Sequence, residues 1–138
     1  MAKLREKIEA EIENIEKVLS LLGQAGQPND LSTIELAGLA SFVHNFYNGI
    51  ENILKQILIS TGEKIPDSPS WHSDLLKTAV DKKIISLKLA KNLKGFLAFR
   101  HFFSHAYSFD IDKKLLMPLV KRTRTVYKNF LNEIQNFR

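Results

Sequence analysis

The stretch from Ser32 to Ser60, STIELAGLASFVHNFYNGIENILKQILIS, decides the fold. Ser32 and Glu35 stand at capping-box spacing at its start, where each side chain can satisfy a backbone donor that a helix leaves unpaired. Its apolar residues then recur every three or four positions, which places them on one face of a helix. These residues are Phe42, Phe46, Ile50, Ile53, Leu54, Ile57 and Leu58. The pattern predicts one long helix from just after Ser32 to about Ser60.

The same periodicity on both sides of this stretch predicts further helices. The expected segments are residues 3–22, a short helix around 75–80, 86–103, and 112 to the end. Gly23 suits the end of the first helix and Ser86 the start of the fourth, whereas Pro118 requires a first-turn position or a kink in the last. Because no window alternates apolar and polar residues, we expect no sheet. The fold class is therefore all-α, an antiparallel bundle of four to five helices.

Length and composition restrict the class of protein. The 138 residues suffice for a single domain, 1–138, and the absence of cysteine excludes disulfides, thiolate metal sites and a cysteine nucleophile. The opening residues, MAKLREKIEAEIENIEK, lack the apolar run of a signal peptide, and no stretch is apolar enough to span a membrane. We therefore expect a cytoplasmic protein with no membrane partner. The net charge of +5 can attract RNA but is also typical of a solvated basic surface.

The residues best suited to chemistry lie in FRHFFSHAYSFDID, positions 99–112. On a helix continuing through this segment, Arg100, Ser104 and Tyr107 would share one stripe, and His101 and His105 a second. Arg100 and His105 would then point about 140° apart, because a helix turns by about 100° per residue. Either the helix end distorts, or a second copy of the chain supplies the missing residue.

Three roles for this segment are open on residue types alone. Histidine can exchange protons with the 2′-hydroxyl or the leaving oxygen of RNA near neutral pH, while arginine stabilises the phosphate. His101 and His105 have the spacing of metal ligands, but no third ligand is evident. Alternatively, the histidines and their aromatic neighbours serve only packing.

The segment resembles the R-x4-H motif of the HEPN superfamily, with Arg100 and His105 as its ends. His101 fits the position after the arginine, and Tyr107 extends the match to the R-x4-H-x-Y form of HepT toxins. The stretches Phe46–Glu51 and Trp71–Leu76 also look like the HepT pattern, so the resemblance covers roughly residues 40–130.

This resemblance implies a HEPN-like bundle that forms a homodimer in which two motifs face one cleft. It implies a metal-independent endoribonuclease, without cofactor, that acts as the toxin of a type VII-like toxin–antitoxin pair. Arg100 and His105 would be catalytic, with His101 and Ser104 supporting RNA binding. The antitoxin would be a minimal nucleotidyltransferase (MNT) that transfers AMP to Tyr107. The alternative is a non-catalytic HEPN binding subunit that partners such a nucleotidyltransferase.

The remaining polar and aromatic residues favour structural roles. We expect His44 and Tyr47 to be packing or surface residues rather than catalytic ones, and Trp71 and His72 to anchor a loop against the bundle. For Glu51 too a structural role is favoured over the alternative, which is to orient a cationic side chain of the cleft.

Overall fold

A computed structural model describes residues 2–24, 30–65 and 69–138 as a bundle of α-helices, and contains no strand in these ranges. The prediction of an all-α bundle is confirmed. The α-helices are α1 (Ala2–Leu22), α2 (Thr33–Ser60), α3 (Trp71–Asp81), α4 (Leu87–His105) and α5 (Lys113–Ile134). Two short 3-10 helices, η2 (Ser108–Asp110) and η3 (Gln135–Phe137), precede and follow α5.

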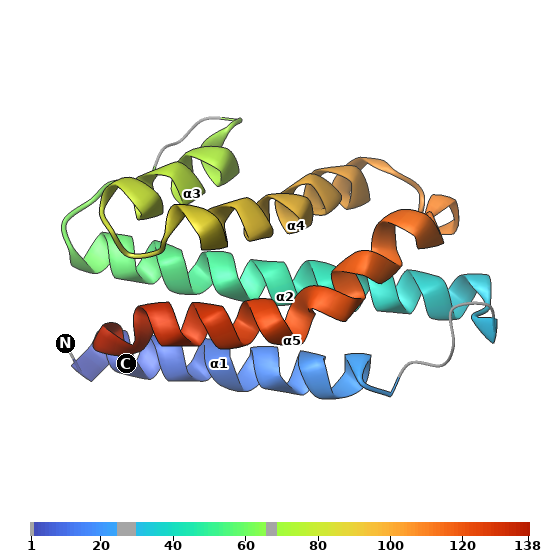
Figure 1. Ribbon diagram of the computed structural model, residues 1–138, viewed down its shortest axis with the longest axis horizontal. Coiled ribbons are helices and arrows are strands. Elements are labelled where there is room, and N and C mark those ends of the chain that lie inside the picture. Colours follow the sequence, from blue (N-terminus) through green and yellow to red (C-terminus); the bar gives the residue numbers. More distant parts are fainter. Residues whose placement is uncertain (1, 25–29, 66–68) are drawn as a thin grey trace.

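The long helix α2 forms the centre of the bundle and packs against every other α-helix. Successive long helices run in opposite directions, with α1 along one side of α2 and α3 and α4 along the other (Figure 1). Helix α5 starts near the end of α4 and crosses α2 toward α1. The apolar face predicted for α2 lies in the core, where Phe46, Ile50, Ile53, Leu54 and Ile57 are fully buried. Because α2 contacts all the other α-helices, polar side chains on α2 can form hydrogen bonds and ion pairs with residues of several helices.

The helix starts follow the local signals of the sequence. The Ser32 hydroxyl accepts a hydrogen bond from the Glu35 N–H at 3.1 Å, and the Glu35 carboxylate accepts one from the Ser32 N–H at 3.1 Å. The Ser86 hydroxyl accepts from the Leu89 N–H, also at 3.1 Å, at the start of α4. Each contact satisfies a donor of the first helical turn, so both predicted caps are confirmed.

Pro118 lies in the second turn of α5, which begins at Lys113. A proline there cannot donate a backbone hydrogen bond, and its ring crowds the preceding turn. Figure 1 shows that α5 changes direction along its first half. The kink alternative therefore holds, and the bend carries the start of α5 toward the end of α4.

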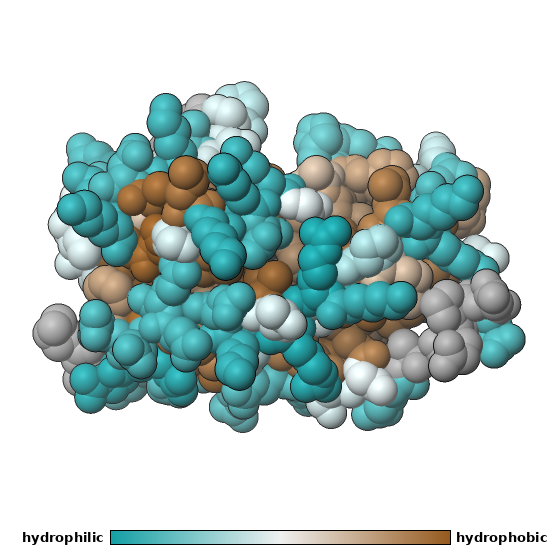
Figure 2. Space-filling view, viewed as in Figure 1, coloured by the Kyte–Doolittle hydropathy of each residue, from teal (hydrophilic) through white to brown (hydrophobic). Residues whose placement is uncertain are grey.

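Hydrophilic residues cover most of the face seen in Figure 2, with apolar patches between them. One patch lies over the region where α3 and α4 meet, above a groove lined in part by Leu76, Val80, Leu87 and Leu97. None of the helices in the described ranges is long and apolar enough to cross a membrane.

Candidate functional site

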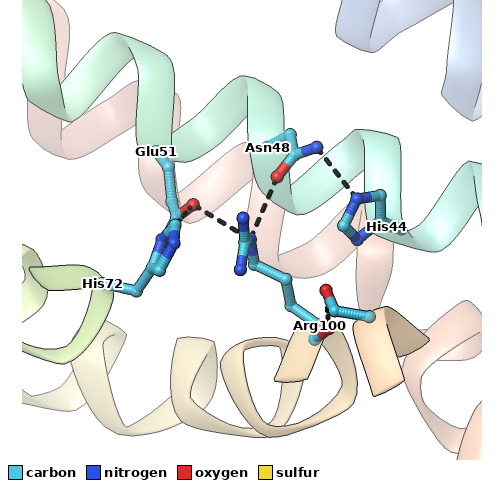
Figure 3. Close-up of polar contacts among 6 residues, drawn as sticks. His44, Asn48, Glu51, His72 and Arg100 are labelled. Carbon is cyan, nitrogen blue, oxygen red and sulfur yellow. Dashed lines mark hydrogen bonds and ion pairs between the residues drawn. The ribbon is translucent and has the colours of Figure 1, made fainter. Parts of the chain in front are cut away.

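A stripe of buried and half-buried polar residues runs along helix α2. His44, Asn48 and Glu51 stand at positions i, i+4 and i+7, so they share one face of the helix. Figure 3 shows this face turned toward α4. Glu51 is only 3 % exposed, and an ionised carboxylate at that depth requires partners.

Arg100 of α4 reaches across to this stripe. Its Nε atom donates to Asn48 Oδ1 at 3.3 Å and lies 3.6 Å from Glu51 Oε1 (Figure 3). Both contacts use Nε, and the terminal guanidinium nitrogens have no hydrogen-bond partner among the residues that the structure describes. Arg100 is thus held through Nε, while its terminal nitrogens, unpaired among the described residues, can bind a carboxylate or a phosphate.

Glu51 is shared between Arg100 and a histidine of α3. His72 Nδ1 lies 3.0 and 2.9 Å from the two Glu51 oxygens. Burial raises the pKa of Glu51, while His72 and Arg100 act in the opposite direction. One buried carboxylate therefore ties α3 and α4 to α2.

Asn48 connects Arg100 to His44. Since its Oδ1 accepts from Arg100, its Nδ2 must donate to His44 Nε2, 3.1 Å away. Nε2 is then unprotonated, and the proton of a neutral His44 lies on Nδ1, which is buried without a hydrogen-bond partner in the described ranges. Burial, and then the positive charge of Arg100, lower the pKa of His44. The ring stacks on Phe103 with centroids 4.9 Å apart, so His44 has the expected packing role and also supports Asn48.

Tyr47 lies beside the polar stripe and belongs to the core. It is fully buried and stacks on Phe96 with centroids 6.5 Å apart. Burial raises the pKa of its hydroxyl, and the negative charge of Glu51 raises it further. The expected packing role of Tyr47 is confirmed.

The other motif residues lie at the exposed end of α4. His105 is the last residue of the helix, and its ring contacts the His101 ring edge-on, with centroids 4.7 Å apart. Both histidines are exposed. Ser104 is exposed as well, and its hydroxyl donates to the Arg100 backbone carbonyl at 2.9 Å. Arg100 thus lies against α2, whereas His105 faces solvent.

Tyr107 does not lie on the helical stripe of Arg100 and Ser104, so that expectation is wrong. The helix ends at His105, and both Ala106 and Tyr107 have extended backbone conformations. The Tyr107 ring is 72 % exposed and stacks on Phe109 with centroids 5.4 Å apart. Tyr107 is presented on the segment after α4, where it is open to a partner protein.

Arg100 and His101 both line a pocket of about 370 Å³ between α3 and α4. The His101 ring also contacts His105, so His101 connects the pocket with the exposed end of the motif. No group of three or more His, Asp or Glu residues in the described part of the chain is placed to hold a metal ion.

The partners of Arg100 were only partly predictable. Glu51 contacts Arg100, which agrees with the alternative that the sequence left less favoured. The sequence assigned Asn48 no role and His72 only that of a loop anchor. A signal was present, because three polar residues at helical spacing, next to the apolar face of α2, require partners where that helix is buried. The identity of their partner could not be predicted from the sequence, because Asn48 and Arg100 are 52 positions apart.

Comparison with known proteins identifies the family. No curated protein matches the chain. A solved structure that resembles it is the cytosolic protein of unknown function YutE from Bacillus subtilis, with a TM-score of 0.78 and 22 % identity, covering 96 % of this chain and 89 % of that one. This likeness shows the fold. A family model described as HepT-like protein matches residues 38–138, and because this region is most of the chain, the protein belongs to the HepT-like family, a family of the HEPN type.

Proposed function

We propose that this protein is the toxin of a HEPN-type toxin–antitoxin pair and cleaves RNA without a metal ion. The observation that carries the proposal is the set of contacts that Arg100 makes. Its Nε is fixed by Asn48 and Glu51, its outer nitrogens are free among the described residues, and His101 links its pocket to His105. An arginine prepared in this way suits a phosphate, and an exposed histidine near it suits proton transfer.

The proposed reaction is an attack of the RNA 2′-oxygen on the adjacent phosphorus. The new bond to phosphorus forms as the bond to the 5′-oxygen breaks, and the 2′-hydroxyl gives up a proton while the leaving oxygen gains one. His105 would serve one of these proton transfers, and Arg100 would stabilise the charge that develops on the phosphate oxygens. His101 and Ser104 would support RNA binding.

We propose that two copies of the chain complete the cleft. Arg100 lies against α2 while His105 faces solvent. A second subunit can therefore bring its own His105 to the Arg100 of the first subunit. The exposed rings of Tyr107 and Phe109, with the exposed Leu115, offer apolar surface next to the motif for such a contact. Light scattering should find a dimer at micromolar concentration, and a monomer would contradict this arrangement.

We also propose that an MNT-type antitoxin inactivates the toxin by attaching AMP to Tyr107. The phenol oxygen would displace pyrophosphate from ATP, leaving an anion next to the cleft that repels RNA. The exposure of Tyr107 supports access by such an enzyme. Tyr107→Phe should retain cleavage but resist inactivation by the nucleotidyltransferase and ATP, as followed by mass spectrometry. Inactivation of this variant through another residue would contradict the assignment.

The decisive experiment is inducible expression of the wild type and His105→Ala, with growth and the integrity of total RNA as readouts. The wild type should arrest growth and degrade RNA, and His105→Ala should do neither. Cleavage by the purified protein should persist in EDTA, and Arg100→Lys should impair it because an ammonium lacks the guanidinium fork. Intact RNA with both proteins would instead favour the alternative, a non-catalytic binding subunit that partners a nucleotidyltransferase.

A further inference from the structure

The pocket between α3 and α4 is open beside Arg100 and has the composition of a phosphate site. Lys94, Ala98 and His101 stand at i, i+4 and i+7 on one wall, so a single face of α4 builds it. The first turn of α3, with His72 and Ser73, forms the facing wall. At about 370 Å³ the pocket is within the range of small-molecule sites, which is about 300–1,000 Å³.

The charges of the pocket are unbalanced. Lys94 and Arg100 both line it, and no carboxylate is among the described residues that line it. Lys94 has no acidic partner within salt-bridge distance in the described ranges, and the contacts of Arg100 involve only Nε. The Lys94 ammonium and the outer nitrogens of Arg100, whose Nε faces Glu51, therefore meet at one hollow, beside the apolar surface of Leu97. This combination suits a ligand that joins a phosphate to a flat, weakly polar ring.

We propose that this pocket binds one nucleotide of an RNA strand, with the phosphate between Lys94 and Arg100 and the base against Leu97 and Ala98. The inference rests on the proposed function and deepens it, because the 3′-phosphate of the bound nucleotide, next to Arg100, would be the phosphate that is cleaved. His101 lines the pocket and contacts His105, so the strand would leave the pocket along His101 toward His105. The base held there would set which sequence is cut.

Trp71 supplies a built-in probe. It is the only tryptophan of the chain, and its ring lies 3.6 Å, centroid to centroid, from that of His72, which lines the pocket. Each of the four ribonucleoside 3′-monophosphates is titrated into the wild-type protein while Trp71 fluorescence is followed, and calorimetry gives the same affinity independently. Saturable binding with a preference among the four bases is expected.

Three variants locate the binding. Lys94→Ala should weaken affinity roughly tenfold, since it removes one charge-assisted contact. Ala98→Glu places a carboxylate at an exposed helical position of the pocket and should weaken affinity by at least as much. Lys88→Ala is the matched control, because Lys88 is an exposed lysine of the same helix that lines a different pocket, next to α5. Its affinity should stay within twofold of the wild type.

The result separates this inference from the proposed function. No saturable signal with any of the four nucleotides, or equal effects of Lys94→Ala and Lys88→Ala, would overturn the pocket. If His105→Ala then still abolished RNA cleavage, the proposed function would stand without the nucleotide pocket. Binding that depends on Lys94, together with the absence of RNA cleavage, would uphold the pocket and refute the ribonuclease. Cleavage that persists in His105→Ala would contradict the role of His105.

Discussion

Arg100 and His105 are five residues apart on the same helix, yet their surroundings are opposite. Arg100 is held by Asn48 and Glu51 on the central helix, and Glu51 is itself bound by His72. His105 ends α4 in solvent and contacts the exposed ring of His101. The bundle fixes the group that would orient a phosphate, and leaves open the group that would meet RNA or a second subunit. This comparison predicts that changes on the Arg100 side alter stability and activity together, whereas changes on the His105 side alter activity alone.

The largest expected effect is that of His105→Ala on cleavage. Loss of a general acid or base should lower kcat by roughly 10²- to 10⁴-fold. The free energy of unfolding should change by less than about 0.5 kcal/mol, because the side chain is exposed. Kinetics on a labelled RNA and urea denaturation measure the two quantities. If His105→Ala lost activity together with a large part of its free energy of unfolding, His105 would also support the fold. The predicted difference between Arg100 and His105 would then be wrong.

Asn48→Ala should have a smaller effect on cleavage but a larger effect on stability. It removes the 3.3 Å contact to Arg100 Nε, and a hydrogen bond to a charged group contributes about 1.5–3 kcal/mol. Cleavage should therefore fall by roughly tenfold or more, and the free energy of unfolding by about 1–2 kcal/mol.

The matched control for this change is Asn45→Ala, an exposed asparagine of the same helix, which should leave both quantities nearly unchanged. Asn48→Asp keeps an acceptor for Arg100 Nε, so it should retain more activity than Asn48→Ala. Equal activity of Asn48→Ala and Asn45→Ala would show that Arg100 needs no support from α2.

The smallest expected effect concerns pH. The pKa of His44 is lowered from 6.5, so its neutral form favours folding; this contribution is present above pH 6.5 and is lost as pH falls through the lowered pKa. Glu51, whose pKa is raised from 4.5, acts with the opposite sign, and its contribution is lost as pH rises through the raised pKa. His44→Gln should therefore gain stability relative to the wild type as pH falls from about 7.5 to about 5.

Urea denaturation at the two pH values measures this difference. The control is His101→Gln on the exposed side of α4, whose stability difference from the wild type should vary less with pH. A His44→Gln difference that stays constant would place the acid sensitivity elsewhere in the protein.

Local signals predicted the helices well, because caps and apolar periodicity act within a few residues. The Ser32–Glu35 capping box and the Ser86 cap are of this kind. The end of α4 was harder to place, since no glycine or proline occurs between Gly95 and Pro118 to mark it. The position of Tyr107 was predicted wrongly for that reason.

The site was predictable only in its chemistry. The motif indicated which residue types act, and the turn of the helix indicated that Arg100 and His105 diverge. Glu51, His72 and Arg100 meet because distant segments of the chain pack together. A single sequence does not indicate which distant residues will be in contact. Here tertiary structure adds what local propensity cannot.

Gly49, the residue between Asn48 and Ile50, limits how this protein can be shortened. A side-chain carbon at Gly49 would lie 2.5 Å from Ile15 Cγ1, so α1 can pack closely on α2 only because position 49 is a glycine. Ile8, Ile12, Ile15 and Leu19 of α1 are buried in the bundle. A fragment starting at residue 38, where the family match begins, would leave their apolar partners on α2 in water and would aggregate rather than fold. The packed bundle therefore extends beyond the segment matched by the family model, and α1 covers the apolar side of the helix that carries Asn48 and Glu51.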